Sequence, residues 1–461
     1  MIPKKRIEAA LARSMRTGGD FAELFAEDSR TTSLRMLDGK VENAAGGRSR
    51  GVGLRVYKGL LSVYVYGNDL TEEGLARLAD QAADAIGSAQ QVPRDIRLTG
   101  SVCANIHPVR ELPCDVEGAR KADLVRRAYS AAKDYDPAVA QVMVSLSGSE
   151  TDVLIANSEG LMLPDKRVRT RLGIQAVATD GKETQTGFEG PGALKGFEFY
   201  DTFDVEATAR NAARIAVTML KADNCPAGVM PVVIGDGFGG VIFHEACGHS
   251  LEATSVAFGN SEFCGKMGQQ IGSKKLTAID DGTIPNNWGS ENIDDEGTPT
   301  TKLVLIENGI LKNYMVDRLN GRRMNMPVTG SARRQSYAYA PTSRMRNTYI
   351  AAGDDDENEI ISSTAEGLYA KEMGGGSVNP LTGEFNFAVA EGYLIKNGKI
   401  DRPVRGATLI GKGGSTIMKI DRVGKKMWMA EGMCGSSSGS VPTRVGQPMI
   451  RVTDMTVGGR K

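Results

Sequence analysis

The first hundred residues alternate between helical and strand-like patterns of apolar positions. Apolar residues recur at helical spacing over 5–15, which predicts an amphipathic helix. Two β-prone runs, 51–57 and 60–66, flank the turn signal Lys58-Gly59 and predict antiparallel strands. A second helix is expected over 71–86, where Thr71 is placed to cap the first turn.

The same order of elements recurs in the next hundred residues. Helices are expected at 117–133 and 205–221, with strands at 139–147 and 152–157 between them. The N-terminal half is therefore expected to hold two similar α+β units, about 1–95 and 110–222, although their sequences share no strong identity. The polar stretch 223–228 has the composition of a linker, and an N-terminal domain is predicted to end at residue 225.

The second half, 226–461, is expected to form a mainly antiparallel β domain that also carries one prominent helix. A buried strand at 230–234 is followed by a glycine-rich loop and a helix over 241–254. Later strands lead into the hairpin turns Asn308-Gly309 and Asn397-Gly398. The fold class expected for the whole chain is α+β.

Composition and charge narrow the function classes. The 56 basic residues balance the 56 acidic ones, which argues against nucleic acid or an anionic membrane surface as a partner. No apolar run is long enough for a membrane span or a signal peptide, so a cytoplasmic protein is predicted. Six cysteines without regular spacing do not indicate a disulfide framework.

Two of the three histidines form the strongest chemical signal. His244 and His249 lie five residues apart, and Glu245 directly follows the first. Paired histidines with an adjacent glutamate are typical of zinc peptidases, in which the glutamate activates a water. The third histidine, His107, is expected at the surface.

The spacing of five requires a departure from a regular helix. Residues five apart are rotated by about 140° on an α-helix, so the two imidazoles would point apart. A single π-type turn restores their alignment, and Gly248 is expected to supply the permissive backbone for it.

The residues alone leave the third metal ligand open. A catalytic zinc usually takes three protein ligands and keeps one position for water. Glu252, Cys247 and Cys434 are candidates, and the chemistry does not rank Cys434 above Glu252. Cys247 is expected to pack in the core.

An overlapping motif favours a different function. Residues 235–240 fit the pattern GxGxxG between a predicted strand and a predicted helix, the context of a dinucleotide site. Asp236 would face the pyrophosphate, and no second parallel strand is predicted after the helix. A dinucleotide-binding oxidoreductase is therefore the weaker alternative, and the glycines are expected to let the strand turn sharply.

Several segments resemble one known family over nearly the whole chain. The matching motifs are 244–252 (HEACGHSLE), 294–299 (DDEGTP), 333–337 (RRQSY), 344–348 (RMRNT), 374–376 (GGG) and 456–459 (TVGG). Together they resemble the TldD/PmbA (TldE) family of zinc peptidases, whose members were once described as modulators of DNA gyrase.

The resemblance implies specific roles. In members of the TldD type the zinc ligands are the two motif histidines and a C-terminal cysteine, here His244, His249 and Cys434, and the catalytic base is here Glu245. It also implies a heterodimer with a TldE-like homologue that lacks the motif. The segment after the cysteine, Gly435 to Ser440, departs from the family pattern, so substrate contacts there are expected to differ.

The resulting hypothesis is a zinc peptidase that cuts short or unfolded peptides. Its rival is a non-catalytic interaction protein with a structural zinc, which a closed four-ligand site would favour. Arg333, Arg334 and Arg344 match family motifs; they are candidates for holding a substrate carboxylate or for structural ion pairs.

Overall fold

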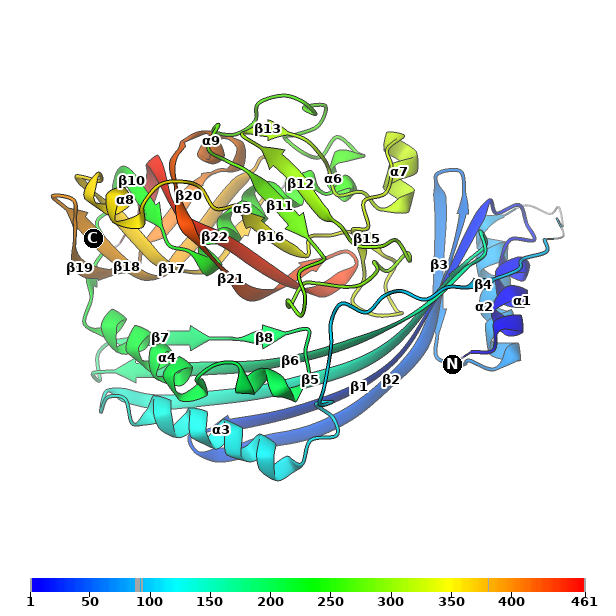
Figure 1. Ribbon diagram of the computed structural model, residues 1–461, viewed down its shortest axis with the longest axis horizontal. Helices are drawn as coiled ribbons and strands as arrows, with labels where there is room; N and C mark the ends of the chain where they lie inside the picture. Colours follow the sequence, from blue (N-terminus) through cyan, green and yellow to red (C-terminus); the bar gives the residue numbers. More distant parts are fainter. Residues whose placement is uncertain (1, 88–91, 93, 380, 460–461) are drawn as a thin grey trace.

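The computed structural model describes residues 2–87, 92, 94–379 and 381–459 of the 461-residue chain. One long, curved and mainly antiparallel sheet forms most of the N-terminal half, and the C-terminal half lies over its concave side (Figure 1). Among the described residues no helix is both long and apolar enough to cross a membrane.

The two expected N-terminal units share a single sheet. The first strand of one unit pairs along its length with the first strand of the other, from Glu23 opposite Asn157 to Leu37 opposite Met143. The runs predicted at 139–147 and 152–157 are one continuous strand, because ladder hydrogen bonds from both neighbours extend it through the polar segment between them. The elements are α1 (Lys4–Ser14), β1 (Phe21–Leu37), β2 (Lys40–Lys58), β3 (Leu61–Gly67), α2 (Glu72–Ile86), β4 (Thr99–Gly100), α3 (Gly118–Lys133), β5 (Val139–Asn157), β6 (Leu161–Thr179), β7 (Thr184–Glu189), β8 (Gly192–Ala193) and α4 (Val205–Leu220).

Alternation along these strands separates two faces. Leu24 and Leu154 pack against α1 and α2, and Leu146 packs against α3 and α4. The intervening residues face the other way, where Phe25 and Val153 meet Ile293 of the C-terminal half. Successive side chains therefore point to opposite faces of the sheet. Helices cover one face, and the second half of the chain covers the other.

The C-terminal half is built on a twelve-stranded, mainly antiparallel sheet. Both predicted Asn-Gly hairpin turns are present, and all four turn residues have positive φ, as the turn type requires. The elements are β9 (Asp223–Asn224), β10 (Gly228–Ile234), α5 (Val241–Phe243), α6 (Ala253–Val256), β11 (Ala278–Asp281), β12 (Lys302–Glu307), β13 (Ile310–Leu311), α7 (Arg318–Met324), β14 (Ala332–Arg333), β15 (Thr342–Ser343), β16 (Asn347–Ile350), α8 (Glu357–Ser362), β17 (Glu366–Val378), β18 (Glu384–Lys396), β19 (Lys399–Arg405), β20 (Thr408–Lys412), α9 (Gly413–Met418), β21 (Ile420–Ser436) and β22 (Gly439–Gly458).

His107 is buried, so its prediction as a surface residue was wrong. The chain after β4 passes onto the C-terminal half, where His107 Nδ1 accepts a hydrogen bond from the backbone N–H of Asn286 at 3.0 Å. Burial, with a contribution from nearby Arg169, lowers the pKa of His107 to about 4. Its position depends on contacts with a segment 179 residues away, which local sequence does not reveal.

Candidate metal centre

The segment with the two histidines contains the predicted π-type turn. After α5, residues His244–Gly248 form one π-helical turn, and His249–Leu251 form a 3₁₀ turn. The two imidazole rings come to lie 5.1 Å apart between centroids. The expected deviation from a regular helix is confirmed, and it places both histidines on one side.

The helix does not continue to residue 254 as predicted. Glu252 is extended, with ψ 132°, and the chain re-enters a helix only at α6. The reason is tertiary: Ala253 N–H donates to the carbonyl of Met315, and Met315 N–H donates to the carbonyl of Leu251. Backbone pairing with a distant segment replaces the helical hydrogen bonds there.

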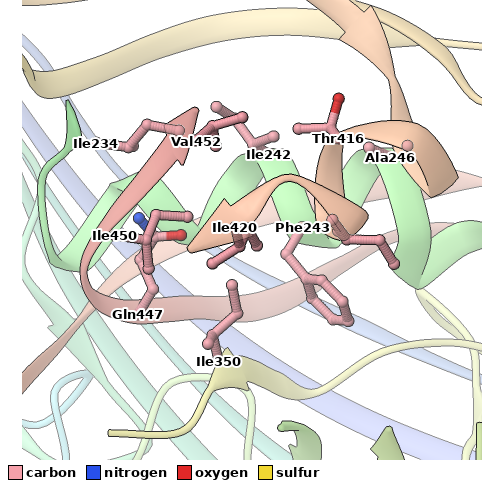
Figure 2. A pocket seen from close by; sticks show the side chains of 12 residues that line it. Ile234, Ile242, Phe243, Ala246, Ile350, Thr416, Ile420, Gln447, Ile450 and Val452 are labelled. Carbon is pink, nitrogen blue, oxygen red and sulfur yellow. The ribbon is translucent and has the colours of Figure 1, made fainter. Parts of the chain in front are cut away.

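The opposite side of this segment is packed into the C-terminal core. Ile242, Phe243 and Ala246 line a small apolar cavity of about 10 Å³ that has room for at most one water (Figure 2). Cys247 and Leu251 are fully buried in the same core. Apolar packing therefore fixes the orientation of the turn that presents His244, Glu245 and His249.

Gly248 has a different role from the one predicted. Its φ of −56° and ψ of −52° are ordinary helical values, so no special backbone freedom is used. A Cβ at this position would lie 2.2 Å from Met345 Sδ. The glycine is needed because the buried Met345 side chain packs directly on the turn.

Three side chains converge in front of the π-helical turn. Cys434, on β21, places its Sγ 3.3 Å from His244 Nε2 and 3.2 Å from His249 Nε2. Within the described ranges, these three residues are the one group of potential ligands whose donor atoms lie within 4.8 Å of one another. Zinc–nitrogen and zinc–sulfur bonds at a tetrahedral angle would separate N and S by about 3.5 Å, so the observed spacing fits a shared zinc ion.

The other two candidate ligands point elsewhere. Glu252 Oε2 accepts a hydrogen bond from His249 Nδ1 at 3.0 Å, on the side of the ring away from Cys434. This contact would fix the tautomer and leave Nε2 free to face the cluster. Cys247 is buried among apolar side chains, and that burial raises the pKa of its thiol well above the usual value.

The cluster favours the ionised form of Cys434. Burial by itself raises the pKa of this thiol, but the imidazoles of His244 and His249 outweigh it and lower the pKa to about 3. Burial likewise opposes protonation of His249, yet Glu252 and Cys434 raise the pKa of His249 well above its usual value. A thiolate is the state in which cysteine binds metals.

Glu245 borders the cluster without belonging to it. Its Oε2 lies 3.8 Å from His249 Nε2, and 26% of its side chain is exposed, whereas His244 and Cys434 are buried. The carboxylate can therefore reach both solvent and any group held at the three converging atoms.

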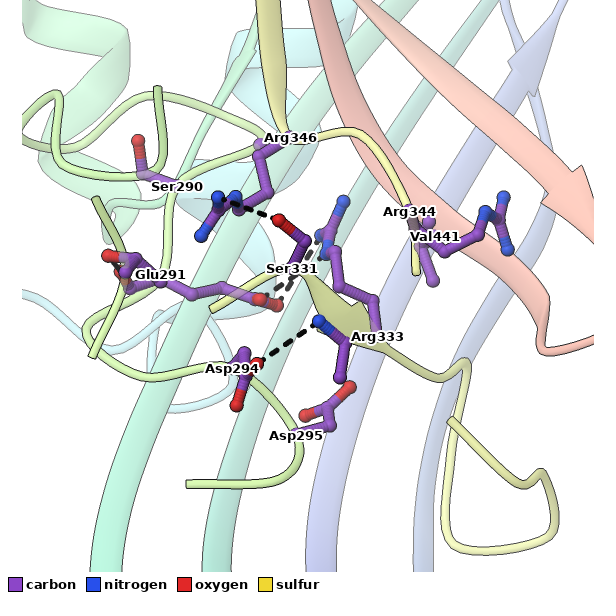
Figure 3. Close-up of polar contacts among 12 residues, drawn as sticks. Ser290, Glu291, Asp294, Asp295, Ser331, Arg333, Arg344, Arg346 and Val441 are labelled. Atoms are coloured by element: carbon purple, nitrogen blue, oxygen red, sulfur yellow. Dashed lines mark hydrogen bonds and ion pairs between the residues drawn. The ribbon is translucent and has the colours of Figure 1, made fainter. Parts of the chain in front are cut away.

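The two adjacent arginines singled out in the sequence have buried protein partners. Arg333 pairs with Glu291 (Figure 3). It also donates a hydrogen bond to the carbonyl oxygen of Met345 at 2.7 Å. Arg334 pairs with Glu23 of the N-terminal sheet at 2.9 Å. Both guanidinium groups are engaged in structural contacts, and neither faces the cluster as a free carboxylate binder.

Other parts of the protein pack directly against the glycines of the loop 235–240. A Cβ at Gly235 would lie 2.2 Å from the carbonyl oxygen of Lys371, and one at Gly240 would lie 2.6 Å from the backbone of Gly446. The strand before the loop, β10, pairs in parallel with β17 and antiparallel with β22. The glycines permit close packing and a sharp turn, and the fold is not that of a dinucleotide-binding unit.

Sequence profiles of one family match the chain in three consecutive parts. They are PmbA/TldA metallopeptidase domain 1 at 22–86, the central domain at 111–220 and the C-terminal domain at 227–459. The chain belongs to the TldD/PmbA family. It is 37% identical to a "Metalloprotease TldD homolog" from Haemophilus influenzae, over 95% of this chain and 93% of that protein.

Other known proteins are similar to this chain in sequence or in fold. A "Zinc metalloprotease TldD homolog" from Saccharolobus solfataricus is 34% identical over 62% of this chain and 64% of its own length. The crystal structure of TldE from Thermococcus kodakarensis has a TM-score of 0.75 at 18% identity, covering 98% of this chain and all of that one. A Thermotoga maritima protein described as a proposed modulator of a DNA gyrase has a TM-score of 0.81 at 20% identity, covering 99% of each chain. These two likenesses show the shared α+β fold.

Proposed function

We propose that this metallopeptidase-family chain is a zinc-dependent peptidase in which His244, His249 and Cys434 hold the metal and Glu245 is the general base. The observation that carries the proposal is the convergence of two imidazole nitrogens and one cysteine sulfur beside a partly exposed carboxylate. Two nitrogens and a sulfur form a donor set that suits zinc.

Each residue has a distinct task in the proposed reaction. Bound zinc supplies Lewis-acid chemistry, lowering the pKa of a water to about 7 and stabilising negative charge on a peptide carbonyl oxygen. The Glu245 carboxylate accepts the proton of the attacking water and can return it to the departing amine nitrogen. Glu252 holds His249 with Nε2 toward the cluster, through the hydrogen bond to Nδ1.

The number of ligands distinguishes this proposal from a structural zinc site. A structural site is closed by four protein ligands, whereas a catalytic site keeps one position open. In the part of the chain that the structure describes, three residues meet at the cluster, and the carboxylate of Glu252 is hydrogen-bonded to His249 Nδ1 on the other side of the ring. The arrangement favours an enzyme over a non-catalytic interaction protein.

Short or unfolded peptides are the proposed substrates. The segment of β17 beyond Ala370 pairs with β18 but no longer with β10, which leaves one backbone edge without a described strand partner. No atom lies within 4 Å of the position that a Cβ of Gly375 would occupy. An extended peptide could add to this edge through main-chain hydrogen bonds, which folded proteins cannot offer without local unfolding.

The proposed partner is a TldE-like homologue that forms a heterodimer with this chain. The shared fold with TldE from Thermococcus kodakarensis supports it, since homologous subunits can pack through related surfaces. Co-purification of the two chains, followed by mass measurement of the complex, tests the proposal. Full peptidase activity of this chain alone would contradict it.

The test of the catalytic assignment is Glu245→Gln. We expect unchanged zinc content and hydrolysis of an unstructured peptide lowered by about 10²–10⁴-fold, because the amide cannot accept the proton. Glu307→Gln is the matched control, because it makes the same change at an exposed glutamate of the β12–β13 hairpin that does not belong to the cluster. It should leave hydrolysis unchanged. Retained activity in Glu245→Gln would reject the base assignment, and lost metal would make Glu245 a ligand.

The test of substrate class is a panel of unrelated unstructured peptides against a stable folded domain, with the TldE-like chain present. We expect cleavage of most peptides and none of the folded domain. Strict dependence on one side chain, or ready cleavage of the folded domain, would contradict the proposal.

A further inference from the structure

The cysteine of the cluster lies close to the tip of a β-hairpin. Over residues 427–436, β21 pairs with β22 and with no other described strand, and the hairpin closes at the pair Ser436 and Gly439. Sheet pairing alone therefore leaves the tip free to bend relative to the helical segment that carries the histidines. Other contacts must set the distance between Cys434 and the two rings.

One buried arginine contacts both strands of this tip. Arg344 is fully buried beside the hairpin and apart from the Glu291–Arg333 pair (Figure 3). Its Nη2 donates to the carbonyl oxygen of Cys434, and its Nη1 donates to Ser438 Oγ and to the carbonyl oxygen of Gly439, both at 2.9 Å. A planar guanidinium holds these three acceptors in fixed relative positions.

The same arginine also lies next to the carboxylate that orients His249. Arg344 Nε is 3.9 Å from Glu252 Oε1, which accepts the backbone N–H of Met345 at 3.3 Å. The other oxygen of Glu252 accepts His249 Nδ1–H. A continuous path of polar contacts thus runs from His249 through Glu252 and Arg344 to the backbone of Cys434.

We propose that Arg344 is a positioning residue that fixes Cys434 relative to His249 and so sets the geometry of the metal site. The inference rests on the proposed zinc site and deepens it. Ser438 is part of the device: it lies in the serine-rich segment after the cysteine and is fully buried, with its hydroxyl on the Arg344 guanidinium. The segment 435–440, which departs from the family pattern, therefore has a structural role in this chain through Ser438.

The experiment compares Arg344→Lys and Arg344→Met with Arg171→Met. Arg171 is the matched control because its Nη2 donates to the carbonyl of Glu431 on the same strand, three residues before the cysteine. Zinc affinity is measured by competition with a chelator. In cobalt-loaded protein, the thiolate-to-cobalt charge-transfer band reports whether Cys434 reaches the metal.

For both Arg344 variants we expect zinc affinity lowered by about 10–100-fold, the usual effect of losing an outer-shell partner, together with a weaker charge-transfer band. Arg344→Lys should not retain the zinc affinity, because one ammonium group cannot donate to all three acceptors in the geometry of the planar guanidinium. Arg171→Met should keep the affinity and the band of the unsubstituted protein. Wild-type affinity and band in the Arg344 variants would overturn the proposal, even if their unfolding temperature falls.

A second variant covers the case in which the Arg344 variants do not fold. Ser438→Ala removes one of the three hairpin contacts and keeps the guanidinium, so a smaller loss of affinity and band intensity is expected. Unchanged values in Ser438→Ala would then overturn the proposal. If the unsubstituted protein itself binds neither zinc nor cobalt, the proposed metal site fails, which is a result distinct from failure of the positioning role.

Discussion

His244 and His249 lie on a turn whose other side is packed into the C-terminal core, whereas Cys434 lies on a hairpin tip that polar contacts hold in place. The turn owes its shape to five consecutive residues and to apolar packing behind them. The tip owes its position to side chains such as Arg344 and Gln335, which accepts the backbone N–H of Ser440 at 2.8 Å. One part of the site is thus held mainly by apolar packing and the other mainly by polar contacts.

This difference predicts how each part responds to substitution. On the turn, added volume should do the most damage, because close-packed interiors accommodate extra atoms poorly. On the hairpin, lost hydrogen bonds should do the most damage, while added volume in open positions should do little. Substitutions at matched positions of the two segments can test that contrast.

Cys434→Ser should have the largest effect on the metal. A serine hydroxyl is a far poorer zinc ligand than a thiolate, so we expect a loss of affinity beyond the about 10–100-fold that an outer-shell contact is worth. Cys247→Ser is the control, since Cys247 lies in the core and should affect stability without changing metal content. Metal analysis after dialysis measures both, and a fully loaded Cys434→Ser protein would reject the ligand assignment.

Glu252→Ala should have an intermediate effect. Its carboxylate orients His249 through Nδ1, so the variant should still bind one zinc per chain at saturation, with affinity lowered by about 10–100-fold. Chelator competition measures the affinity. If Glu252→Ala loses its zinc and Cys434→Ser retains it, Glu252 is the third ligand.

The arrangement of His244 and His249, which are close in sequence, could be predicted from the sequence. The approach of Cys434 to them could not. The spacing of His244 and His249 demanded a π-type turn, which the structure contains, because that argument needs only helix geometry. Cys434 could be chosen over Glu252 only through the family resemblance, since the two ligand-bearing segments are 185 residues apart. The role of Gly248 was predicted wrongly, because the Met345 side chain that contacts it comes from another segment.

The fold shows the same division between local and tertiary information. The helices at 5–15, 71–86, 117–133 and 205–221 and the two Asn-Gly hairpins follow from periodicity and turn chemistry, and the structure contains them all. Periodicity did not show that the strands of both N-terminal units join in one sheet through the β1–β5 ladder. It also missed the end of the site helix at Leu251, which depends on backbone pairing with Met315.

Gly248→Ala and Gly435→Ala give the finest test of the contrast. A methyl group at 248 would meet Met345 Sδ at 2.2 Å, and because Met345 is fully buried it has little room to move. We expect the free energy of unfolding of the metal-free protein to fall by about 1–3 kcal/mol, as in other overpacked cores.

At 435, on the hairpin, nothing lies within 4 Å of the added methyl group, and φ is not positive, so the change should stay within about 0.5 kcal/mol. Urea unfolding of both variants measures the difference. The double variant Gly248→Ala with Met345→Ala should lose less stability than the sum of its parts, because removing the methionine side chain relieves the clash. Additive losses of stability in the double variant, or equal urea midpoints for Gly248→Ala and Gly435→Ala, would contradict the view that packing against Met345 holds the turn.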